Sequence, residues 1–276
     1  MLLTTSVLAM MLSGQAVIPG ALDVQPSQPP QAQAQPEPKA PDPQEQKAEA
    51  KEPPTPPHTG IHALFGDLVE DVKHLPAMQN LYLAAIGGGL AAAAHPADRT
   101  LNARLVSNYD TVNKAFAPGK YIGDTPEQVA LSLGTYAFGR IFKQPKTSHL
   151  GMDLLQAQIL TELLVQPIKF AAGRERPDGS NHQSFPSGHA AVTFATATVI
   201  ERHLGWRKSL LGYTIASYVA ASRLHDNRHY LSDVIFGAAV GSIAGRTVVH
   251  HASDYWALTP VRVPGGGVAL MVTYRK

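Results

Sequence analysis

The chain has 276 residues, and 44% of them are hydrophobic, which allows one sizeable core with further segments beside it. The absence of cysteine excludes disulfides, thiolate chemistry and cysteine-based zinc sites. The formal net charge is +2, but residues 1–57 are acidic, and the remainder carries about +5. This excess favours an anionic ligand or an anionic membrane surface. It gives no reason to expect a nucleic-acid partner.

The first 57 residues divide into two segments of different composition. Residues 1–22 carry no charged side chain and contain the apolar run Val7–Leu12, which predicts a signal peptide or apolar leader. Gly14-Gln15-Ala16 is a candidate cleavage site, although no Lys or Arg precedes the run. Residues 23–57 are rich in Pro, Gln and Ala, which predicts a disordered linker. We therefore expect an exported protein, periplasmic or otherwise extracytoplasmic.

From residue 58 onward, apolar residues recur every three or four positions, which predicts helices. The first helix has an apolar face and three acidic residues outside that face. The face consists of Leu64, Leu68, Val72 and Leu75, and the acidic residues are Asp67, Glu70 and Asp71. Residues 81–94 then predict a helix of small side chains, in which Gly87-Gly88-Gly89 allows another helix to approach closely.

The remaining pattern predicts further helices and one short strand. Pro126-Glu127 marks the start of one helix. The apolar residues at 152–163 predict another helix, which is expected to continue to Pro167 and to kink there, just before Lys169. Three more helices are predicted at His189–His203, Lys208–Ser222 and Tyr230–His250. The sequence thus predicts an all-α bundle of about six or more helices in a domain at 58–256. The tail at 257–276 contains a candidate short strand, Val268–Tyr274.

The predicted helices are short of the length that membrane-spanning helices need. A spanning helix requires about 20 apolar residues, whereas the uncharged runs Ser209–Ser222 and Val234–Gly245 are shorter. The sequence therefore favours amphipathic helices of a soluble domain. An integral membrane protein with its site facing outward is the alternative, because helices rich in Gly and Ala also pack within membranes.

The first chemical cluster is Lys169 and Arg176, seven residues apart and followed by Pro177. On a continuing helix the two cations would share a face. Two solvated surface cations are the simpler interpretation of this pair alone. The nearby Arg174 is interpreted as surface charge.

The second cluster is Pro186-Ser187-Gly188-His189, directly before the apolar stretch 190–200. Ser187 is a suitable N-cap, and Gly188 lets a ligand approach the backbone closely. Backbone amides at a helix start bind anions. His189 would lie in the first turn of this helix, directed at the anion, although a plain helix cap would explain the tetrapeptide in isolation.

The third cluster contains Arg223, His229 and Asp233. On a helix, a carboxylate four residues after His229 could hold one imidazole nitrogen and leave the other free as a nucleophile. Arg223 could bind phosphate oxygens with two hydrogen bonds. His225, His229 and Asp233 also suggest a zinc-binding face. We expect no metal there, because the three cations of these clusters would repel a dication, and we interpret His225 as a loop or surface residue.

These three clusters together resemble the signature of the type 2 phosphatidic acid phosphatase superfamily. The signature reads Lys-x6-Arg-Pro, Pro-Ser-Gly-His and Ser-Arg-x5-His-x3-Asp. The matching segments are Lys169–Pro177, Pro186–His189 and Ser222–Asp233. Every defined position is present and in order. The resemblance covers residues 80 to 250 approximately, and implies the helical fold of the acid phosphatases and haloperoxidases.

The resemblance also implies a mechanism and a role for each site residue. His229 would attack phosphorus and form a phosphohistidine, Asp233 would orient it, and His189 would protonate the leaving group and then activate water. The residues expected to hold the phosphoryl oxygens are Lys169, Arg176, Arg223, Ser187 and Gly188. Cations and helix-start amides can meet the charge on those oxygens, so the reaction requires no metal or cofactor.

Two other functions are compatible with the same motifs. Vanadium-dependent haloperoxidases share them, although their chains are usually much longer. A binding protein that has kept the fold without catalysis is the second alternative, and the complete motifs argue against it. The expected substrate is a phosphate ester, either a membrane lipid phosphate or diphosphate or a small soluble phosphomonoester.

Overall fold

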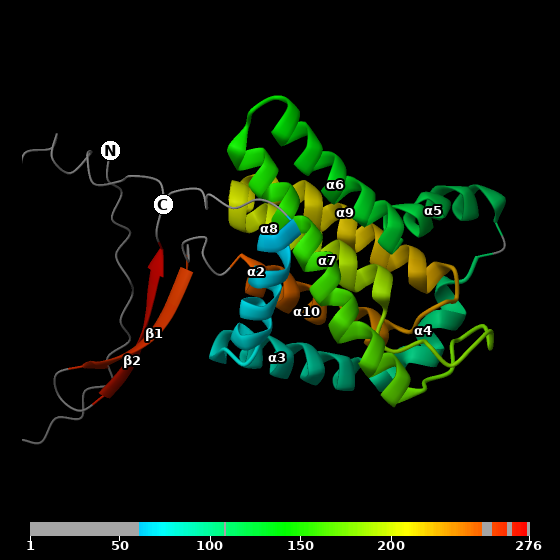
Figure 1. Ribbon diagram of the computed structural model, residues 1–276. Helices are drawn as coiled ribbons and strands as arrows, with labels where there is room; N and C mark the ends of the chain where they lie inside the picture. Colours follow the sequence, from blue (N-terminus) through cyan, green and yellow to red (C-terminus); the bar gives the residue numbers. More distant parts are fainter. Residues whose placement is uncertain (1–60, 108, 250–255, 264–266, 275–276) are drawn as a thin grey trace, which may run out of the picture. The chain divides into compact units, whose positions relative to one another are not determined.

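The computed structural model describes residues 61–107, 109–249, 256–263 and 267–274 (Figure 1). The predicted leader at 1–22 and linker at 23–57 lie outside the described residues. The helices are α2 Ile61–His74, α3 Met78–Ala94, α4 Asp98–Leu105, α5 Asp110–Ile122, α6 Thr125–Ile141, α7 Pro145–Ala172, α8 Gly188–Leu204, α9 Trp206–His225 and α10 Leu231–Val248. A short 3-10 helix, His95–Ala97, joins α3 to α4, and strands β1 Trp256–Val263 and β2 Gly267–Tyr274 form an antiparallel hairpin.

The predicted all-α fold is confirmed, because helices make up the described residues from 61 to 249 apart from short connections. Two helices, α4 and α5, were not predicted. Helix α4 has only eight residues and is polar, and α5 contains Pro118 followed by Gly119, both of which weaken a helical pattern. Strand β2 coincides with the alternating segment at Val268–Tyr274.

Helices α8 and α10 pack against each other at the centre of the bundle, with α7 and α9 also against α8. Glycines on α10 allow this close approach. A Cβ added to Gly241 would lie 1.9 Å from the carbonyl oxygen of Ala191, and one added to Gly237 would lie 2.4 Å from that of Ser187. The start of α8 is therefore held directly against the first half of α10. The predicted close approach at the triple glycine also occurs, because Gly87 faces Ala239 of α10.

A hydrophobic core lies between α7, α8 and α10. Its fully buried side chains include Leu154, Leu160, Val199 and Val248, with Leu68 and Leu75 of the α2 region packed against them. The predicted face of α2 is partly wrong, because Val72 is 47% exposed while Asp71 is buried. The face of α2 that packs on α7 and α10 is therefore rotated about the helix axis, relative to the face predicted from the apolar residues.

Helix α7 runs without interruption through Pro167 and ends at Ala172. Gly173 then adopts a left-handed conformation (φ 51°), which glycine reaches at little cost. Arg176 therefore lies in the connection from 173 to 187, and the predicted shared helical face of Lys169 and Arg176 is wrong. Four helix ends nevertheless meet at one end of the bundle, and the site residues lie there. They are the C-terminal ends of α7 and α9 and the N-terminal ends of α8 and α10.

Candidate active site

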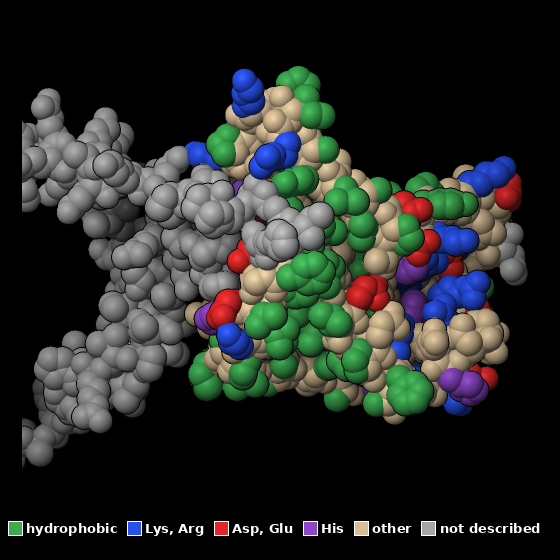
Figure 2. Space-filling view, in the orientation of Figure 1, with side chains coloured by type: hydrophobic (Ala, Val, Ile, Leu, Met, Phe, Trp, Pro, Cys, Tyr) green, Lys and Arg blue, Asp and Glu red, His purple; other side chains and the backbone are tan. Residues whose placement is uncertain are grey.

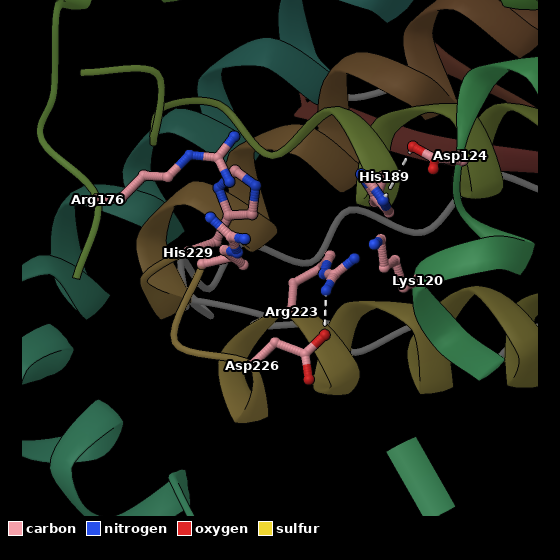
Figure 3. Close-up of a pocket in the computed structure, with 8 residues that line it drawn as sticks. Lys120, Asp124, Arg176, His189, Arg223, Asp226 and His229 are labelled. Atoms are coloured by element: carbon pink, nitrogen blue, oxygen red, sulfur yellow. Dashed lines mark hydrogen bonds and ion pairs between the residues drawn. The ribbon is translucent and has the colours of Figure 1, made fainter. Parts of the chain in front are cut away.

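A cavity of about 470 Å³ lies where these four helix ends meet (Figure 3). Four of the residues that line it were predicted from the sequence: Arg176, His189, Arg223 and His229. Four others were not: Lys120, Asp124, Asp226 and Arg228. Four cations and two carboxylates in the lining give the cavity an excess of positive charge, which suits a multiply charged anion.

His229 lies in the connection before α10 and is only 2% exposed. Its Nδ1 lies 2.6 Å from the carbonyl oxygen of Ser184. Because a carbonyl only accepts hydrogen bonds, Nδ1 carries the proton, and Nε2 keeps its lone pair. Burial, opposed in part by Asp233, lowers the pKa of His229 to about 4. The ring is therefore neutral at pH 7, with a nucleophilic nitrogen available to the cavity.

Asp233 lies in the first turn of α10 and is fully buried. Its Oδ2 accepts hydrogen bonds from Ser184 Oγ (2.5 Å) and from the backbone amide of Tyr230 (2.8 Å). The distance from Oδ2 to His229 Nδ1 is 3.8 Å. His229 precedes α10, so the two residues do not share a helical face as predicted. Asp233 instead contacts both segments, around Ser184 and Tyr230, that hold the His229 ring.

Arg174 is part of this network, and its interpretation as surface charge is wrong. Its Nη1 lies 2.5 Å from Asp233 Oδ1, and its Nη2 lies 2.7 Å from Asp98 Oδ2. The guanidinium also stacks on the ring of Tyr230, 4.2 Å from the centroid. One arginine thus bridges two buried carboxylates, Asp98 of α4 and Asp233 of α10.

Replacing Arg174 by leucine should destabilise the protein and impair the site. Removing one partner of a buried ion pair costs about 3 kcal/mol, because the remaining carboxylates stay buried without their counterion. We expect a fall in the free energy of unfolding of about that size and a lower kcat, both measured on purified protein. The control is Arg207→Leu, an exposed arginine on α9, for which a change within about 0.5 kcal/mol is expected. Equal stability of the two variants would contradict the assigned role.

Arg223 and Arg176 present guanidinium groups to the cavity. Arg223 is 3% exposed and its Nη2 pairs with Asp226, while its Nε has no hydrogen-bond partner among the described residues. Arg176 donates from Nε to Asn181 Oδ1 over 2.9 Å. A buried guanidinium nitrogen without an acceptor is costly. An anion in the cavity would provide the missing acceptor.

His189 occupies the first turn of α8, where Ser187 accepts a hydrogen bond from the amide of Ala190, as the predicted N-cap requires. Its Nε2 lies 3.3 Å from Asp124 Oδ1. Burial, followed by the cations Arg223 and Arg176 among other neighbours, lowers the pKa of His189 to about 3. The ring is neutral at pH 7 unless an anion offsets those cations.

Three of the predicted phosphate-binding residues, Lys169, Ser187 and Gly188, are not among the described residues that line the cavity. Lys169 Nζ donates to the carbonyl oxygens of Pro186 (2.6 Å) and Gln183 (3.0 Å), and so fixes the segment that precedes α8. A Cβ on Gly188 would make only ordinary contacts, the nearest at 3.8 Å from Lys169.

His225 ends α9 and is buried, so its interpretation as a loop or surface residue is wrong. Its ring stacks on Phe116, with centroids 4.6 Å apart. Its Nδ1 and Nε2 lie 3.1 Å from the carbonyl oxygen of Leu105 and 2.9 Å from Asn113 Oδ1, respectively. His225 thus joins α9 to the ends of α4 and α5, which the sequence did not predict.

Comparison with known proteins finds relatives of the C-terminal part of the helical domain. Residues 150–256 match the model of the PAP2 superfamily. The lipid A 1-phosphatase of Porphyromonas gingivalis is 47% identical over 85 residues, which cover 30% of this chain and 19% of that protein. A PA-phosphatase related-family protein of Dictyostelium discoideum is 28% identical over 149 residues, covering 42% of this chain and 55% of that one. The chain thus spans about a fifth and about half of these two relatives.

Among solved structures, the transmembrane PAP2 type phosphatidylglycerolphosphate phosphatase from Bacillus subtilis has a similar fold. The TM-score is 0.53 at 24% identity, and the alignment covers 62% of this chain and 94% of that one. The matched family segment contains His189, Arg223, His229 and Asp233. The predicted resemblance is confirmed, because residues 150–256 match the PAP2 superfamily and contain the three residues of the third cluster.

Proposed function

We propose that this chain is a metal-independent phosphatase that hydrolyses a lipid phosphate through a phosphohistidine on His229. The observation that carries the proposal is the environment of that ring. Its Nδ1 is hydrogen-bonded to the carbonyl of Ser184, so Nε2 is left as a neutral nucleophile beside an excess of cations. The family match and the named relatives support assignment to the phosphoric ester hydrolases.

In the first step, Nε2 of His229 attacks phosphorus, and the bond between phosphorus and the ester oxygen breaks. Arg176 and Arg223 stabilise the charge on the non-bridging oxygens, and Lys120 and Arg228 add to the positive field. The phosphate charge offsets these cations, which raises the pKa of His189 and allows it to bind a proton. His189 then donates this proton to the leaving alkoxide, with Asp124 beside its Nε2.

In the second step, a water molecule attacks the phosphohistidine. His189 accepts a proton from the water as the new phosphorus–oxygen bond forms and the phosphorus–nitrogen bond breaks. His229 returns to its neutral form, with Nδ1 still donating to Ser184. Phosphate leaves the cavity. The two histidines therefore have separate roles. His229 is the nucleophile, because its hydrogen bond to the Ser184 carbonyl holds the ring and leaves Nε2 unprotonated, and His189 transfers the protons.

A lipid is favoured over a soluble ester because the structure has a second, apolar hollow, lined by a residue that is adjacent in the chain to a residue of the catalytic cavity. This hollow of about 460 Å³ lies between α6 and α7 and is lined by Val129, Ile159 and Leu163 among others. Thr125 lies at its border and follows Asp124, which lines the catalytic cavity. An acyl chain attached to the bound phosphate could therefore lie in this hollow.

We infer membrane association from the outer surface of the helices. Figure 2 shows hydrophobic side chains over α3 and α7, whereas Lys, Arg and His gather at the end that carries α4 and α5. The exposed apolar residues include Leu81, Ile86 and Leu90 on α3, Phe138 and Ile141 on α6, and Leu210, Leu211 and Ile215 on α9. So large an apolar surface is unusual for a soluble monomer and suits contact with lipid. The exposed apolar surface therefore favours membrane association over the soluble domain that the sequence alone favoured.

Among the described helices, one is both long enough and apolar enough to cross a membrane. This helix is α10, but 56% of it is buried inside the protein, as in core helices of soluble proteins. The apolar surface is thus the stronger support for membrane association. Export to the periplasm remains a prediction from the first 22 residues.

The substrate class is tested by comparing a short-chain phosphatidic acid in detergent micelles with p-nitrophenyl phosphate, both with and without EDTA. We expect a higher kcat/KM for the lipid and no loss with EDTA. Val129→Trp should fill the apolar hollow, raise KM for the lipid at least about tenfold and leave p-nitrophenyl phosphate turnover unchanged. The control is Leu210→Trp, on the exposed surface of α9.

Three results would contradict the proposal. Equal kcat/KM values for both substrates, with no effect of Val129→Trp, would indicate a soluble phosphomonoester. Loss of activity in EDTA that returned with added metal would contradict the metal-independent mechanism. Halide oxidation after addition of vanadate, without phosphatase activity, would instead favour a haloperoxidase.

A further inference from the structure

A second cluster of histidines lies at the opposite ends of the two helices that bear Lys169 and His189. It consists of His149 and Asp153 near the start of α7 and His203 in the last turn of α8. Twenty residues of continuous helix separate His149 from Lys169. At 1.5 Å per residue, this cluster lies about 30 Å from the catalytic cations along α7. It takes no part in the proposed hydrolysis.

The three side chains converge on one point. His203 Nε2 lies 2.7 Å from Asp153 Oδ2, and His149 Nε2 lies 3.5 Å from Asp153 Oδ1. The imidazole centroids are 5.2 Å apart, and the rings are inclined by 75°. The potential ligand atoms all lie within 4.8 Å of one another. Ligands of one tetrahedral zinc ion are about 3.4 Å apart, given bonds of 2.0 to 2.2 Å, so small side-chain movements would bring all three into range.

Burial supports a bound cation at this point. The Asp153 side chain is 3% exposed, and the side chains of His149 and His203 are 15% and 13% exposed. A buried carboxylate requires a counterion or a metal, because removing its charge from water is costly. A divalent ion bound at this point would offset that charge.

We propose that His149, Asp153 and His203 bind a divalent transition metal, with zinc as the best match. Two imidazole nitrogens and one carboxylate oxygen are donors that zinc prefers, and a water molecule would complete a tetrahedral site. The arrangement differs from the catalytic cavity, where the excess of cations would repel a dication. Because the ligands come from both helices, the metal would fix the start of α7 against the end of α8. This site does not depend on the proposed phosphatase activity.

The test uses the purified full-length chain in detergent, stripped with a chelator and freed of it. We expect Zn²⁺ to bind with one equivalent per chain in calorimetry and to raise the Tm by about 5 °C at a hundredfold excess over Kd. Co²⁺ should give the visible absorption bands of a tetrahedral ion. Phosphatase activity at a temperature well below the Tm should be the same with and without metal.

Conservative variants distinguish a metal site from a hydrogen-bonded contact between the helices. His203→Gln can still donate to Asp153 but lacks an imidazole ligand, so it should lose the Zn²⁺-dependent rise in Tm and weaken binding at least about tenfold. Asp153→Asn should do the same. The control is His182→Ala, an exposed histidine outside the cluster, which should bind Zn²⁺ like the wild type. Absence of stoichiometric binding by the wild type, or full binding by His203→Gln and Asp153→Asn, would overturn the proposal.

Discussion

Replacing His229 by alanine is expected to lower kcat by about 10,000-fold or more, because the variant lacks the group that we propose attacks phosphorus. The ring is buried in a cavity whose cations are already in place, so substrate should still bind. KM should therefore change far less than kcat. The measurement is steady-state hydrolysis of phosphatidic acid and of p-nitrophenyl phosphate by the purified variant.

The matched control for His229→Ala is His74→Ala, an exposed histidine on α2. Its kcat should remain within about twofold of the wild type, since surface substitutions usually change little. Circular dichroism and thermal unfolding must show that the His229 variant is folded. If a folded His229→Ala enzyme retained more than a tenth of the wild-type kcat, another residue would have to be the nucleophile.

Replacing His189 by asparagine should separate the two substrates. An alkoxide leaves only if it receives a proton, so kcat for the lipid should fall by about 100-fold to 10,000-fold. The p-nitrophenolate ion is stable without a proton, so formation of the phosphohistidine should be much less affected with p-nitrophenyl phosphate. Because His189 is also proposed to activate water, a burst of p-nitrophenolate followed by slow turnover is expected in stopped-flow measurements.

A different pattern for His189→Asn would contradict the general-acid role. Equal losses in the first step for both substrates, without a burst, would mean that His189 mainly binds the phosphate. The same experiment with Asp124→Asn tests whether that carboxylate assists the proton transfer. We expect a smaller loss for this variant, because Asp124 contacts His189 and not the ester oxygen.

The long periodic helices could be predicted from the sequence within a few residues of their ends. The predicted segment His189–His203, for example, is α8 at Gly188–Leu204. Helix α5 could not, because Pro118 and Gly119 break its pattern. A Cβ on Gly119 would lie 2.3 Å from Ser222 Oγ, so its packing against α9 needs a glycine there. Because α5 was not predicted, its residue Lys120 and the following Asp124 could not be assigned to the site.

Motif spacing identified four of the eight residues that line the cavity, but not the contacts that position them. Arg174 and Asp98 are 76 residues apart, and Ser184 and His229 are 45 apart. Such contacts depend on how α4, α7 and α10 pack, which periodicity does not determine. The hydrogen bonds of Lys169 to the carbonyl oxygen of Pro186 and of Asp233 to Ser184 could not be predicted for the same reason.

The most direct test of the central claim is to trap the phosphoenzyme. Wild type and His189→Asn are mixed with ³²P-labelled substrate, quenched in alkali and digested, and the labelled peptide is identified by mass spectrometry. The mechanism predicts an acid-labile, alkali-stable phosphate on His229, in greater yield in the His189 variant. A phosphate on any other residue, or no label in a variant that shows a burst, would contradict it.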